Sequence, residues 1–337
     1  MLRYLVFLFS VFSGIGCAQA ADWRVDTLKL PAIAERVFLQ DNGQSLRKVR
    51  IRTRGGGWMF IGRCGENLCA KETTAGFSTP PLPAGALPDA EISYGKKGIH
   101  AAWLAAPTKR YDHGILGDAI EAGAIVAEDE TRRRHTLELG LDSVFEDRLA
   151  RLADLDSDGK DEIVVVRSYL DRGGSLAVLE LTSHGLEIKA ESPAIGKPNR
   201  WLNPAGIADF DGDGRPEIAV VVTPHIGGTL EFWEYRGGRL VRDKQLRGFS
   251  NHAIGSRVQE MSAVGDFDGD GVVDLALPGD GHRTIRLISI AKGSVAEIAR
   301  IALPGRIVTE MIAVKPRAQK RPAIVTGLHT GKLAIIR

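Results

Sequence analysis

The sequence contains the same acidic segment three times at a nearly constant interval. The first aspartates of the three copies are Asp154, Asp209 and Asp266, so the intervals are 55 and 57 residues. A fixed interval of this size is typical of repeat architectures, in which each repeat is one supersecondary unit that buries its faces against its neighbours. The interval therefore constrains the fold more strongly than any single motif in the chain.

Each repeat has the same internal pattern, which predicts four antiparallel strands. A short apolar run leads into the acidic segment, and a second run follows it, with the sequence EIVVV, EIAVVV or DLAL. A glycine turn, an alternating strand, another turn and a fourth strand complete the repeat. β-Branched residues, alternation and closely spaced glycine turns favour strands, and no segment has a sustained helical periodicity. The predicted repeats span residues 143–194, 195–249 and 250–302.

Repeated four-stranded units predict an all-β fold, a β-propeller of about six four-stranded blades, with five or seven blades left open. Residues 307–337 have the pattern of a further unit with three strands. We expect the segment 23–30 to supply the missing outer strand and to close the ring. Residues 90–139 are interpreted as another unit and residues 34–73 as part of one more. The proline-rich segment 79–88 is predicted to be a long loop.

The spacing of the carboxylates predicts a calcium site in each repeat. In the second copy Asp209, Asp211 and Asp213 alternate, a glycine follows, and Glu217 ends the segment. Carboxylates at alternate positions converge when the loop coils around a point, and their repulsion there is relieved by a cation. Ca²⁺ accepts about six to eight oxygen ligands, here including the backbone carbonyl of the seventh residue, whereas Mg²⁺ prefers fewer protein ligands. The predicted ligands are Asp154, Asp156, Asp158, Lys160 and Glu162, then Asp209, Asp211, Asp213, Arg215 and Glu217, then Asp266, Asp268, Asp270, Val272 and Asp274.

Two alternatives to this interpretation are an EF-hand and an Asp-rich turn without an ion. An EF-hand has a glutamate at its twelfth position and a helix after the loop. The twelfth residues here are Val165, Val220 and Leu277, and each loop continues into a predicted strand, which disfavours an EF-hand. The same ligand spacing in three copies favours calcium over an ion-free turn.

The repeats resemble the FG-GAP/VCBS repeats of integrin-α-like β-propellers in the segments DLDSDGKDEIVVV, DFDGDGRPEIAVVV and DFDGDGVVDLAL. The resemblance covers roughly residues 143–300 and depends on the calcium-loop motif. It implies a propeller in which the loop between the first two strands of a blade binds Ca²⁺, and this agrees with the strand order inferred from the residues.

The first twenty residues are predicted to be a secretory signal peptide. Arg3 gives a positively charged start, residues 4–12 form an apolar run too short to span a bilayer, and small residues precede a cleavage site after Ala20. The alternative is a lipoprotein signal with lipidation at Cys17. No later segment is long and apolar enough for a membrane helix. We therefore expect an exported protein, periplasmic or extracellular, with residues 21–337 as a single propeller domain.

Two further cysteines, Cys64 and Cys69, lie five residues apart. In an oxidising compartment, cysteines this close predict a disulfide that closes a small loop. A metal site would need two more soft ligands nearby, and the local sequence supplies none.

One segment departs from the repeat pattern and contains Asp112, His113, Asp118 and Glu121. These side chains are interpreted either as turn residues of a degenerate blade or as a catalytic cluster. No nucleophile motif, phosphate loop or dinucleotide motif is present, and the formal net charge of +2 does not indicate nucleic acid. The sequence therefore favours a non-catalytic binding module for an unknown protein or glycan. The alternative is a propeller hydrolase or lyase with its site near Asp112 and His113.

Overall fold

The computed structural model describes residues 23–40, 45–74, 80–316 and 319–337. Nearly all of its ordered elements are β-strands, so the all-β prediction is confirmed. The helical elements are short 3₁₀ turns, namely η1 (Leu46–Lys48), η2 (Asp280–His282) and η3 (Ala291–Gly293). No helix in this part of the chain is long and apolar enough to cross a membrane. The predicted signal peptide and Cys17 lie outside the described residues.

The three predicted repeats each contain a four-stranded antiparallel unit, which we number 3, 4 and 5 along the chain. Unit 3 consists of β11 (Arg151–Ala153), β12 (Glu162–Tyr169), β13 (Gly173–Thr182) and β14 (Gly185–Glu191). Unit 4 consists of β15 (Leu202–Ala208), β16 (Glu217–Val222), β17 (Thr229–Arg236) and β18 (Arg239–Arg247). Unit 5 consists of β19 (Ala263–Gly265), β20 (Asp274–Pro278), β21 (Thr284–Ser289) and β22 (Ala296–Ala302). In every unit, strands adjacent in the sequence are adjacent in the sheet.

The first and last strands of the described chain pair with each other in unit 6. This unit contains β23 (Ile307–Val314), β24 (Ala323–Leu328), β25 (Lys332–Ile336) and, at its outer edge, β1 (Val25–Lys29). Val25 lies opposite Ile336, and Lys29 lies opposite Lys332, in an antiparallel register. The prediction that an N-terminal strand completes the last unit is confirmed.

The N-terminal part of the chain forms two more units. Unit 1 is a complete four-stranded sheet, although the sequence predicted part of a unit. Unit 1 consists of β2 (Ala34–Leu39), β3 (Val49–Thr53), β4 (Trp58–Cys64) and β5 (Asn67–Thr73). Unit 2 consists of β6 (Ser93–Tyr94), β7 (Ile99–Thr108), β8 (Glu121–Asp129) and β9 (Arg134–Glu138). A short strand, β10 (Ser143–Phe145), pairs with both β8 and β12 and so joins units 2 and 3 into one nine-stranded sheet.

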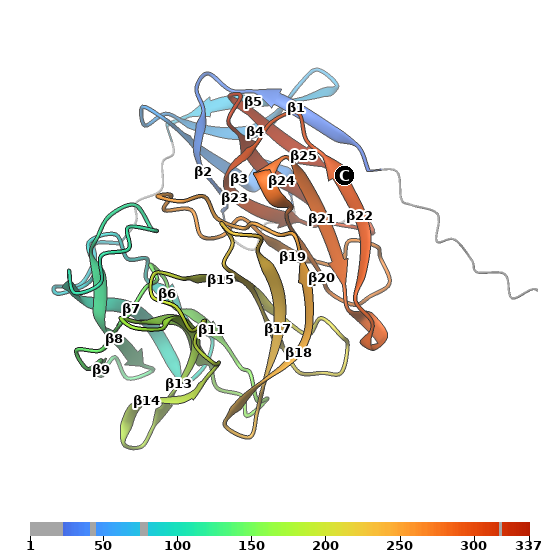
Figure 1. The fold of residues 1–337 in the computed structure, drawn as a ribbon. Helices are drawn as coiled ribbons and strands as arrows, with labels where there is room; N and C mark the ends of the chain where they lie inside the picture. The colour runs from blue at the N-terminus through green and yellow to red at the C-terminus, as the bar shows by residue number, and fades with distance from the viewer. Residues whose placement is uncertain (1–22, 41–44, 75–79, 317–318) are drawn as a thin grey trace, which may run out of the picture.

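The second strand of each repeat is apolar without a break because it is buried on both faces. In β16, Ile218 packs in a core shared with Val164 of unit 3, whereas its neighbour Ala219 packs in a core shared with Leu275 of unit 5. Successive side chains of a strand point to opposite faces, so one strand contributes to two interfaces. Similar apolar cores join the units in the order 2, 3, 4, 5, 6 and 1. Figure 1 shows this succession, with unit 6 beside unit 1 at the top and units 2 and 3 at the lower left.

Units 1 and 2 meet through polar contacts. Arg36 of β2 forms an ion pair with Glu91, which precedes β6, with 3.0 Å between Nη1 and Oε1. The second face of unit 2 is covered by the preceding loop, from which Ala86 and Ile92 pack against Trp103 and its neighbours. The described part of the predicted 79–88 loop contains no strand. No sheet formed by the described residues closes on itself.

Candidate metal centres

The three acidic loops occupy equivalent positions in units 3, 4 and 5. Each loop connects the first strand of its unit to the second, between β11 and β12, β15 and β16, or β19 and β20. Its second residue is apolar and buried, namely Leu155, Phe210 or Phe267. The apolar side chain anchors the loop in the core, and the polar residues around it stay at the surface.

The loop of unit 4 brings its four predicted carboxylates together. Asp209, Asp211, Asp213 and Glu217 each offer an oxygen within 4.8 Å of the others. The backbone N–H of Gly214 donates to Asp209 Oδ2 at 2.9 Å, and that of Asp213 donates to Asp211 Oδ1 at 2.9 Å. These bonds coil the backbone around the carboxylates, as the alternating sequence predicts.

The other two loops assemble three carboxylates each. Asp154, Asp156 and Glu162 converge within 4.8 Å in unit 3, and so do Asp266, Asp268 and Asp274 in unit 5. The third aspartates, Asp158 and Asp270, lie outside these groups and are exposed.

The seventh residue of each loop forms a hydrogen bond through its backbone. The N–H groups of Lys160, Arg215 and Val272 donate to the third aspartate of their loop at 2.7 to 2.9 Å. These bonds turn the third aspartate back toward the chain. The predicted role of the three carbonyl groups as calcium ligands stays a prediction.

The last acid of each loop begins the second strand and is buried. Glu162, Glu217 and Asp274 each accept the backbone N–H of the buried second loop residue, at 2.6, 2.7 and 2.8 Å. One bond per loop therefore ties the acid to the apolar anchor, which fixes the loop relative to the strand.

One buried carboxylate oxygen in each loop has no hydrogen-bond partner in the described structure. These atoms are Asp154 Oδ1, Glu217 Oε1 and Asp274 Oδ1. Buried polar atoms are normally paired, and an unpaired one points to a missing ion or water. An all-oxygen donor set suits Ca²⁺ or Mg²⁺ and does not suit softer metals. The residues present therefore fit a hard divalent cation at all three positions.

The last acid of each loop has a pKa shifted upward. Burial raises the pKa of Glu162 and Glu217 to about 7 and that of Asp274 to about 6, and neighbouring aspartates add to the effect. Burial and neighbouring aspartates also raise the pKa of Asp268. The loops thus concentrate negative charge at a cost that a bound cation relieves.

Glycine is required where the loop turns. Gly214 and Gly271 follow the third aspartate with φ values of 92° and 94°, in the left-handed region. Two residues earlier, Gly212 and Gly269 have φ values of 82° and 84°, but the unit 3 loop has Ser157 there, with φ of 64°. A side chain in this region is strained, so the unit 3 loop is the less favourable version of the turn.

Two further carboxylates extend the group in unit 4. Glu234 of β17 and Asp243 of β18 each place an oxygen within 4.8 Å of Asp211. Arg236 lies 3.6 Å from Asp213 across the same surface. The loop motif gives no signal for Glu234 or Asp243, because their proximity depends on the pairing of Glu217 with Glu234 across β16 and β17.

Cys64 and Cys69 form a disulfide across the β4–β5 hairpin, with 5.8 Å between their Cα atoms. Both residues belong to unit 1, far along the chain from the acidic loops. The bond staples the end of a hairpin.

Of the Asp112, His113, Asp118 and Glu121 side chains, His113 and Glu121 both lie near the buried Glu146, and Asp118 also lies near Glu121. Asp112 is exposed, and Asp118 Oδ2 accepts a hydrogen bond from Arg257 at 3.0 Å. Glu121 is buried in β8, where burial and the nearby Glu146 raise its pKa to about 10. Of the four residues, His113 alone lines the cavity described next, although Glu121 and His113 both lie near Glu146.

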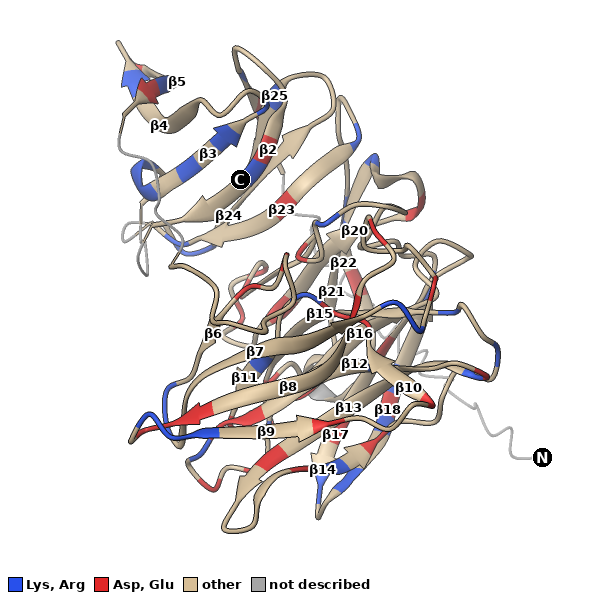
Figure 2. Ribbon diagram, turned by 90° about the vertical axis from the view of Figure 1, so that its left-hand side faces the viewer, with Lys and Arg blue, Asp and Glu red and all other residues tan. Residues whose placement is uncertain are grey.

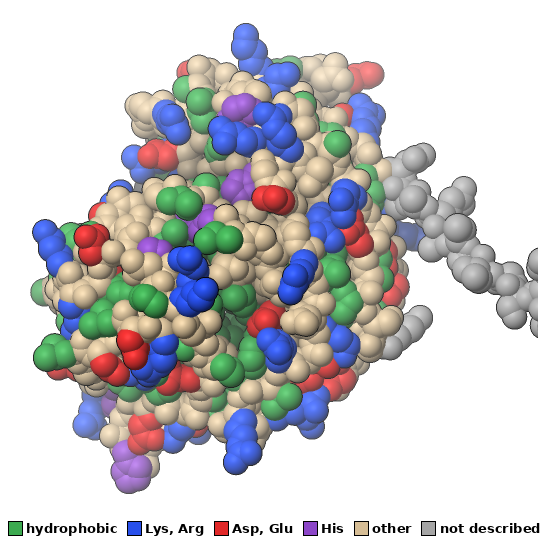
Figure 3. Space-filling view, in the orientation of Figure 1, with side chains coloured by type: hydrophobic (Ala, Val, Ile, Leu, Met, Phe, Trp, Pro, Cys, Tyr) green, Lys and Arg blue, Asp and Glu red, His purple; other side chains and the backbone are tan. Residues whose placement is uncertain are grey.

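His113 contacts Glu146 and also lines a cavity. Its Nδ1 lies 2.5 Å from Glu146 Oε1, and its ring lines a cavity of about 210 Å³ together with Trp201 and His225. His225 Nε2 lies 3.0 Å from His252 Nδ1. Figure 3 shows several histidine side chains gathered on one face of the molecule. The segment around residue 113 thus contributes to a histidine-rich surface built from several units.

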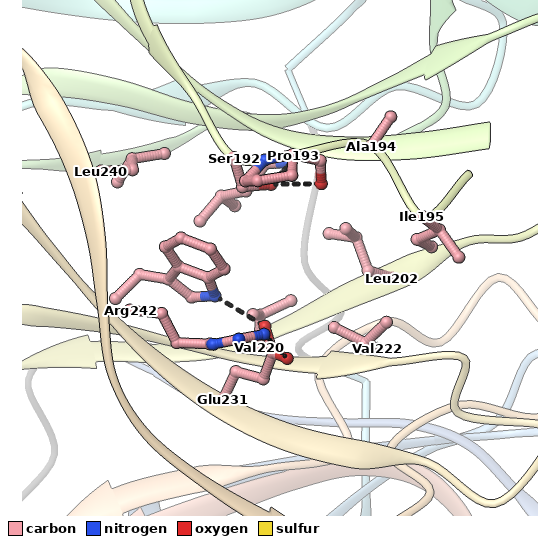
Figure 4. Close-up of a pocket in the computed structure, with 12 residues that line it drawn as sticks. Ser192, Pro193, Ala194, Ile195, Leu202, Val220, Val222, Glu231, Leu240 and Arg242 are labelled. Atoms are coloured by element: carbon pink, nitrogen blue, oxygen red, sulfur yellow. Dashed lines mark hydrogen bonds and ion pairs between the residues drawn. The ribbon is translucent and has the colours of Figure 1, made fainter. Parts of the chain in front are cut away.

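A larger cavity, of about 470 Å³, lies between units 3 and 4 (Figure 4). Apolar side chains such as Leu176 and Val220 line most of it. On one side Glu231 accepts hydrogen bonds from the Trp233 indole at 3.0 Å and from Arg242 at 2.9 Å. An apolar lining with a few polar groups and a volume of about 300–1,000 Å³ is typical of small-ligand sites.

Comparison with known families supports the repeat pattern. A family model described as an FG-GAP-like repeat matches residues 154–220 and 209–277. Each matched segment begins at the first aspartate of an acidic loop and ends in the second strand of the next unit. No curated protein matches the chain.

Proposed function

Because the chain carries FG-GAP-like repeats over residues 154–277, we propose that it is an exported, calcium-binding β-propeller that serves as a non-catalytic binding module for a protein or a glycan. Calcium occupies the loops of units 3, 4 and 5. The partner binds the surface that the six units present.

The unpaired buried oxygens of Asp154, Glu217 and Asp274 carry the calcium proposal. They occur once per loop, in a cradle of carboxylates whose other oxygens are held by backbone N–H groups. Three loops with one unsatisfied acceptor each support a common ligand. The bound ion neutralises the carboxylates and holds the first two strands of its unit together.

Calcium binding stabilises the fold in proportion to site occupancy. Extracellular calcium modules bind at roughly 10⁻⁴ to 10⁻³ M. A tenfold excess over the dissociation constant contributes about 1.4 kcal/mol per site, so three sites contribute about 4 kcal/mol. This is a large part of the net stability of about 5–15 kcal/mol expected for a folded protein.

The succession of six units supports a closed propeller. Five apolar cores join the units in order, and β1 completes unit 6. The remaining junction, between units 1 and 2, is bridged by Arg36, which contacts Glu91 and also Glu310 of β23. These polar contacts close the ring without strand pairing.

Export is supported by the N-terminal sequence and by the Cys64–Cys69 disulfide. Disulfides persist in oxidising compartments such as the periplasm or the extracellular space. Extracellular calcium concentrations also suit loops of modest affinity.

A binding role is supported by the surface rather than by catalytic groups. The cavity between units 3 and 4 is concave and mainly apolar. Among the residues of the hydrolase or lyase alternative, Asp112 is exposed and Asp118 is paired with Arg257, and the sequence supplies no nucleophile motif beside His113 and Glu121. The binding module is therefore the better-supported function.

The test combines calcium titration with partner capture. Calorimetry of the wild type is expected to detect three calcium sites, and a variant with Asp154→Asn, Asp209→Asn and Asp266→Asn is expected to detect none. The immobilised protein is then exposed to envelope proteins and to a glycan array, with calcium or with chelator. Asp171→Asn, an exposed turn residue of unit 3, is the control.

Absence of calcium binding to the wild type contradicts the calcium proposal. Chemical conversion of a captured glycan or protein contradicts the non-catalytic role. A wild-type protein that binds calcium and captures no partner of either class contradicts the binding role alone.

A further inference from the structure

Five arginines from distant parts of the chain line one cavity of about 380 Å³. We call it the arginine cavity. Its arginines are Arg36, Arg52, Arg54, Arg148 and Arg257, and its one acidic lining residue is Glu35. It lies where the first strands of units 1, 5 and 6 begin, whereas the acidic loops follow the ends of first strands. The cavity and the candidate calcium sites are therefore at opposite strand ends.

The alternation of β3 explains why this strand and the turn after it contribute two of the three arginines that come from unit 1. Val49, Ile51 and Thr53 are buried, so Arg52 and Arg54 project from the other face. Basic residues follow one another along this strand (Figure 2). A strand with buried residues at every second position carries the intervening side chains on one surface.

Arg36 and Arg148 form a fixed base for the cavity. The Arg36 guanidinium contacts Glu91 and Glu310, and the Arg148 guanidinium donates to Asp89 Oδ2 at 3.0 Å. These carboxylates lie behind the cavity lining and hold the two guanidinium groups in place. The lining thus includes the arginine of each pair and not its carboxylate partner.

The other three arginines retain unused donors. The backbone N–H of Arg54 donates to the Ile33 carbonyl, but its exposed guanidinium has no ion pair or hydrogen bond within the described residues. Arg52 contacts Glu35 at 3.3 Å, in a pair that is about half exposed. Arg257 uses Nε and Nη2 on Asp89 and Asp118, which leaves Nη1. Arg52, Arg54 and Arg257 are therefore available to bind an anion.

We propose that the arginine cavity binds a small organic molecule with at least two oxyanion groups, either phosphates or carboxylates. Guanidinium groups bind both kinds of oxyanion through paired, charge-assisted hydrogen bonds. The cavity volume is within the range of about 300–1,000 Å³ that small-molecule sites occupy, and it exceeds what a single inorganic anion fills.

A purely structural role explains Arg36, which joins unit 1 to Glu91 and to unit 6, and Arg148, which joins the segment before β11 to Asp89 and Glu91. It does not explain Arg52 and Arg54, since an exposed ion pair contributes about 0–1 kcal/mol and Arg54 has no pair. Arg52 and Arg54 can therefore be substituted without breaking the contacts between the units.

The test uses calorimetry of the full-length protein at a fixed free calcium concentration. Fructose 1,6-bisphosphate is the phosphate probe, benzene-1,3,5-tricarboxylate is the carboxylate probe, and fructose is the neutral control. We expect one or both anionic probes to bind, and inorganic phosphate to bind about tenfold more weakly because it engages fewer guanidinium groups. The stronger probe identifies the preferred oxyanion.

Three variants locate the site. The double variant Arg52→Ser/Arg54→Ser is expected to bind at least about tenfold more weakly, because each lost charge-assisted hydrogen bond lowers affinity by about that factor. Arg63→Ser, an exposed arginine of β4 in the same unit, is expected to bind like the wild type. Glu35→Gln is expected to bind about two- to fivefold more tightly, because it releases Arg52.

Failure of both probes to bind the wild type overturns the proposal. Equal binding by the wild type and the double variant overturns it as well. If the double variant does not fold, the proposal is tested by the affinity of Glu35→Gln and by the NMR signals of the arginine Nε–H groups. Unchanged affinity in Glu35→Gln, or signals that do not shift when the probe is added, overturns the proposal in that case.

Discussion

The carboxylate of Glu217 accepts the backbone N–H of Phe210 at 2.7 Å, and this bond joins the end of an acidic loop to its buried anchor. The equivalent bond occurs in the other two loops. A strand, a loop and a core side chain are thus coupled at one carboxylate. A change in the charge of that carboxylate is therefore transmitted to the packing between neighbouring units.

Removal of calcium is expected to lower the melting temperature. With three sites at about 1.4 kcal/mol each, the free energy of unfolding falls by about 4 kcal/mol when chelator replaces a tenfold excess of calcium. Asp209→Asn is expected to remove about one third of this difference, whereas Asp171→Asn is expected to remove none. Differential scanning calorimetry measures all three proteins, and a melting temperature indifferent to chelator contradicts the prediction.

The calcium-free protein is expected to lose stability as the pH rises from about 4.5 to about 7. The folded-state pKa of Glu217 is about 7, above its ordinary value of 4.5. The folded state therefore binds the proton more tightly, and the stabilisation present below pH 4.5 is lost as the pH rises through the folded pKa. Glu162 contributes in the same direction and over the same range.

Urea denaturation across this range measures the effect. The difference between the wild type and Glu217→Gln isolates the contribution of one residue, since glutamine does not titrate. In saturating calcium we expect the trend to reverse, because the ion binds the deprotonated carboxylate. A wild-type protein that gains stability relative to Glu217→Gln as the pH rises without calcium contradicts the assignment.

Ser157→Gly is expected to stabilise the protein by about 0.5–1 kcal/mol. Ser157 has a φ of 64°, and glycine occupies the equivalent position in the other two loops. Glycine removes the strain of a side chain in the left-handed region. The gain in stability is partly offset because glycine also gives the unfolded chain greater conformational freedom. Ser183→Gly, in an exposed turn without positive φ, is the control, and it is expected to give no gain. Chemical denaturation of both variants checks the prediction.

Leu28→Ala is expected to destabilise the protein by about 2–3 kcal/mol. Leu28 of β1 is buried in the apolar core that joins units 6 and 1, and it lies opposite Leu333. Loss of a buried leucine side chain removes apolar contact and leaves a cavity. The adjacent Lys29 is exposed, and Lys29→Ala is expected to change the free energy of unfolding by less than about 0.5 kcal/mol. Equal effects of the two substitutions in urea denaturation contradict a packing role for β1.

The repeat interval made the central units predictable. Each unit begins with an apolar run, an acidic loop and a buried strand, and all of these signals are local in the sequence. Asp209, Asp211 and Asp213 could be identified as one cluster because the spacing within a loop determines which side chains converge. Asp158 and Asp270 lie outside the clusters of their loops although they occupy the same position as Asp213, and the structure gives no reason for the difference.

The remaining features depend on contacts between distant segments. Glu234 and Asp243 join the unit 4 cluster through strand register, which no local motif encodes. The arginine cavity combines β2, β3, the segment before β11, the loop before β19 and β23. The basic residues of β3 do alternate in the sequence, but alternation does not reveal what lies opposite. Such sites can be predicted only when the order of the units in space is known.

The pairing of β1 with β25 also affects the order of assembly. Val25 and Ile336 are separated by 311 positions along the chain. At a synthesis rate of about 5–20 residues per second, the ribosome completes β25 about 15 to 60 s after β1. The earliest strand is thus inserted last, and an exposed sheet edge persists on the nascent chain until then. A factor that shields this edge during biosynthesis would increase the yield of folded protein.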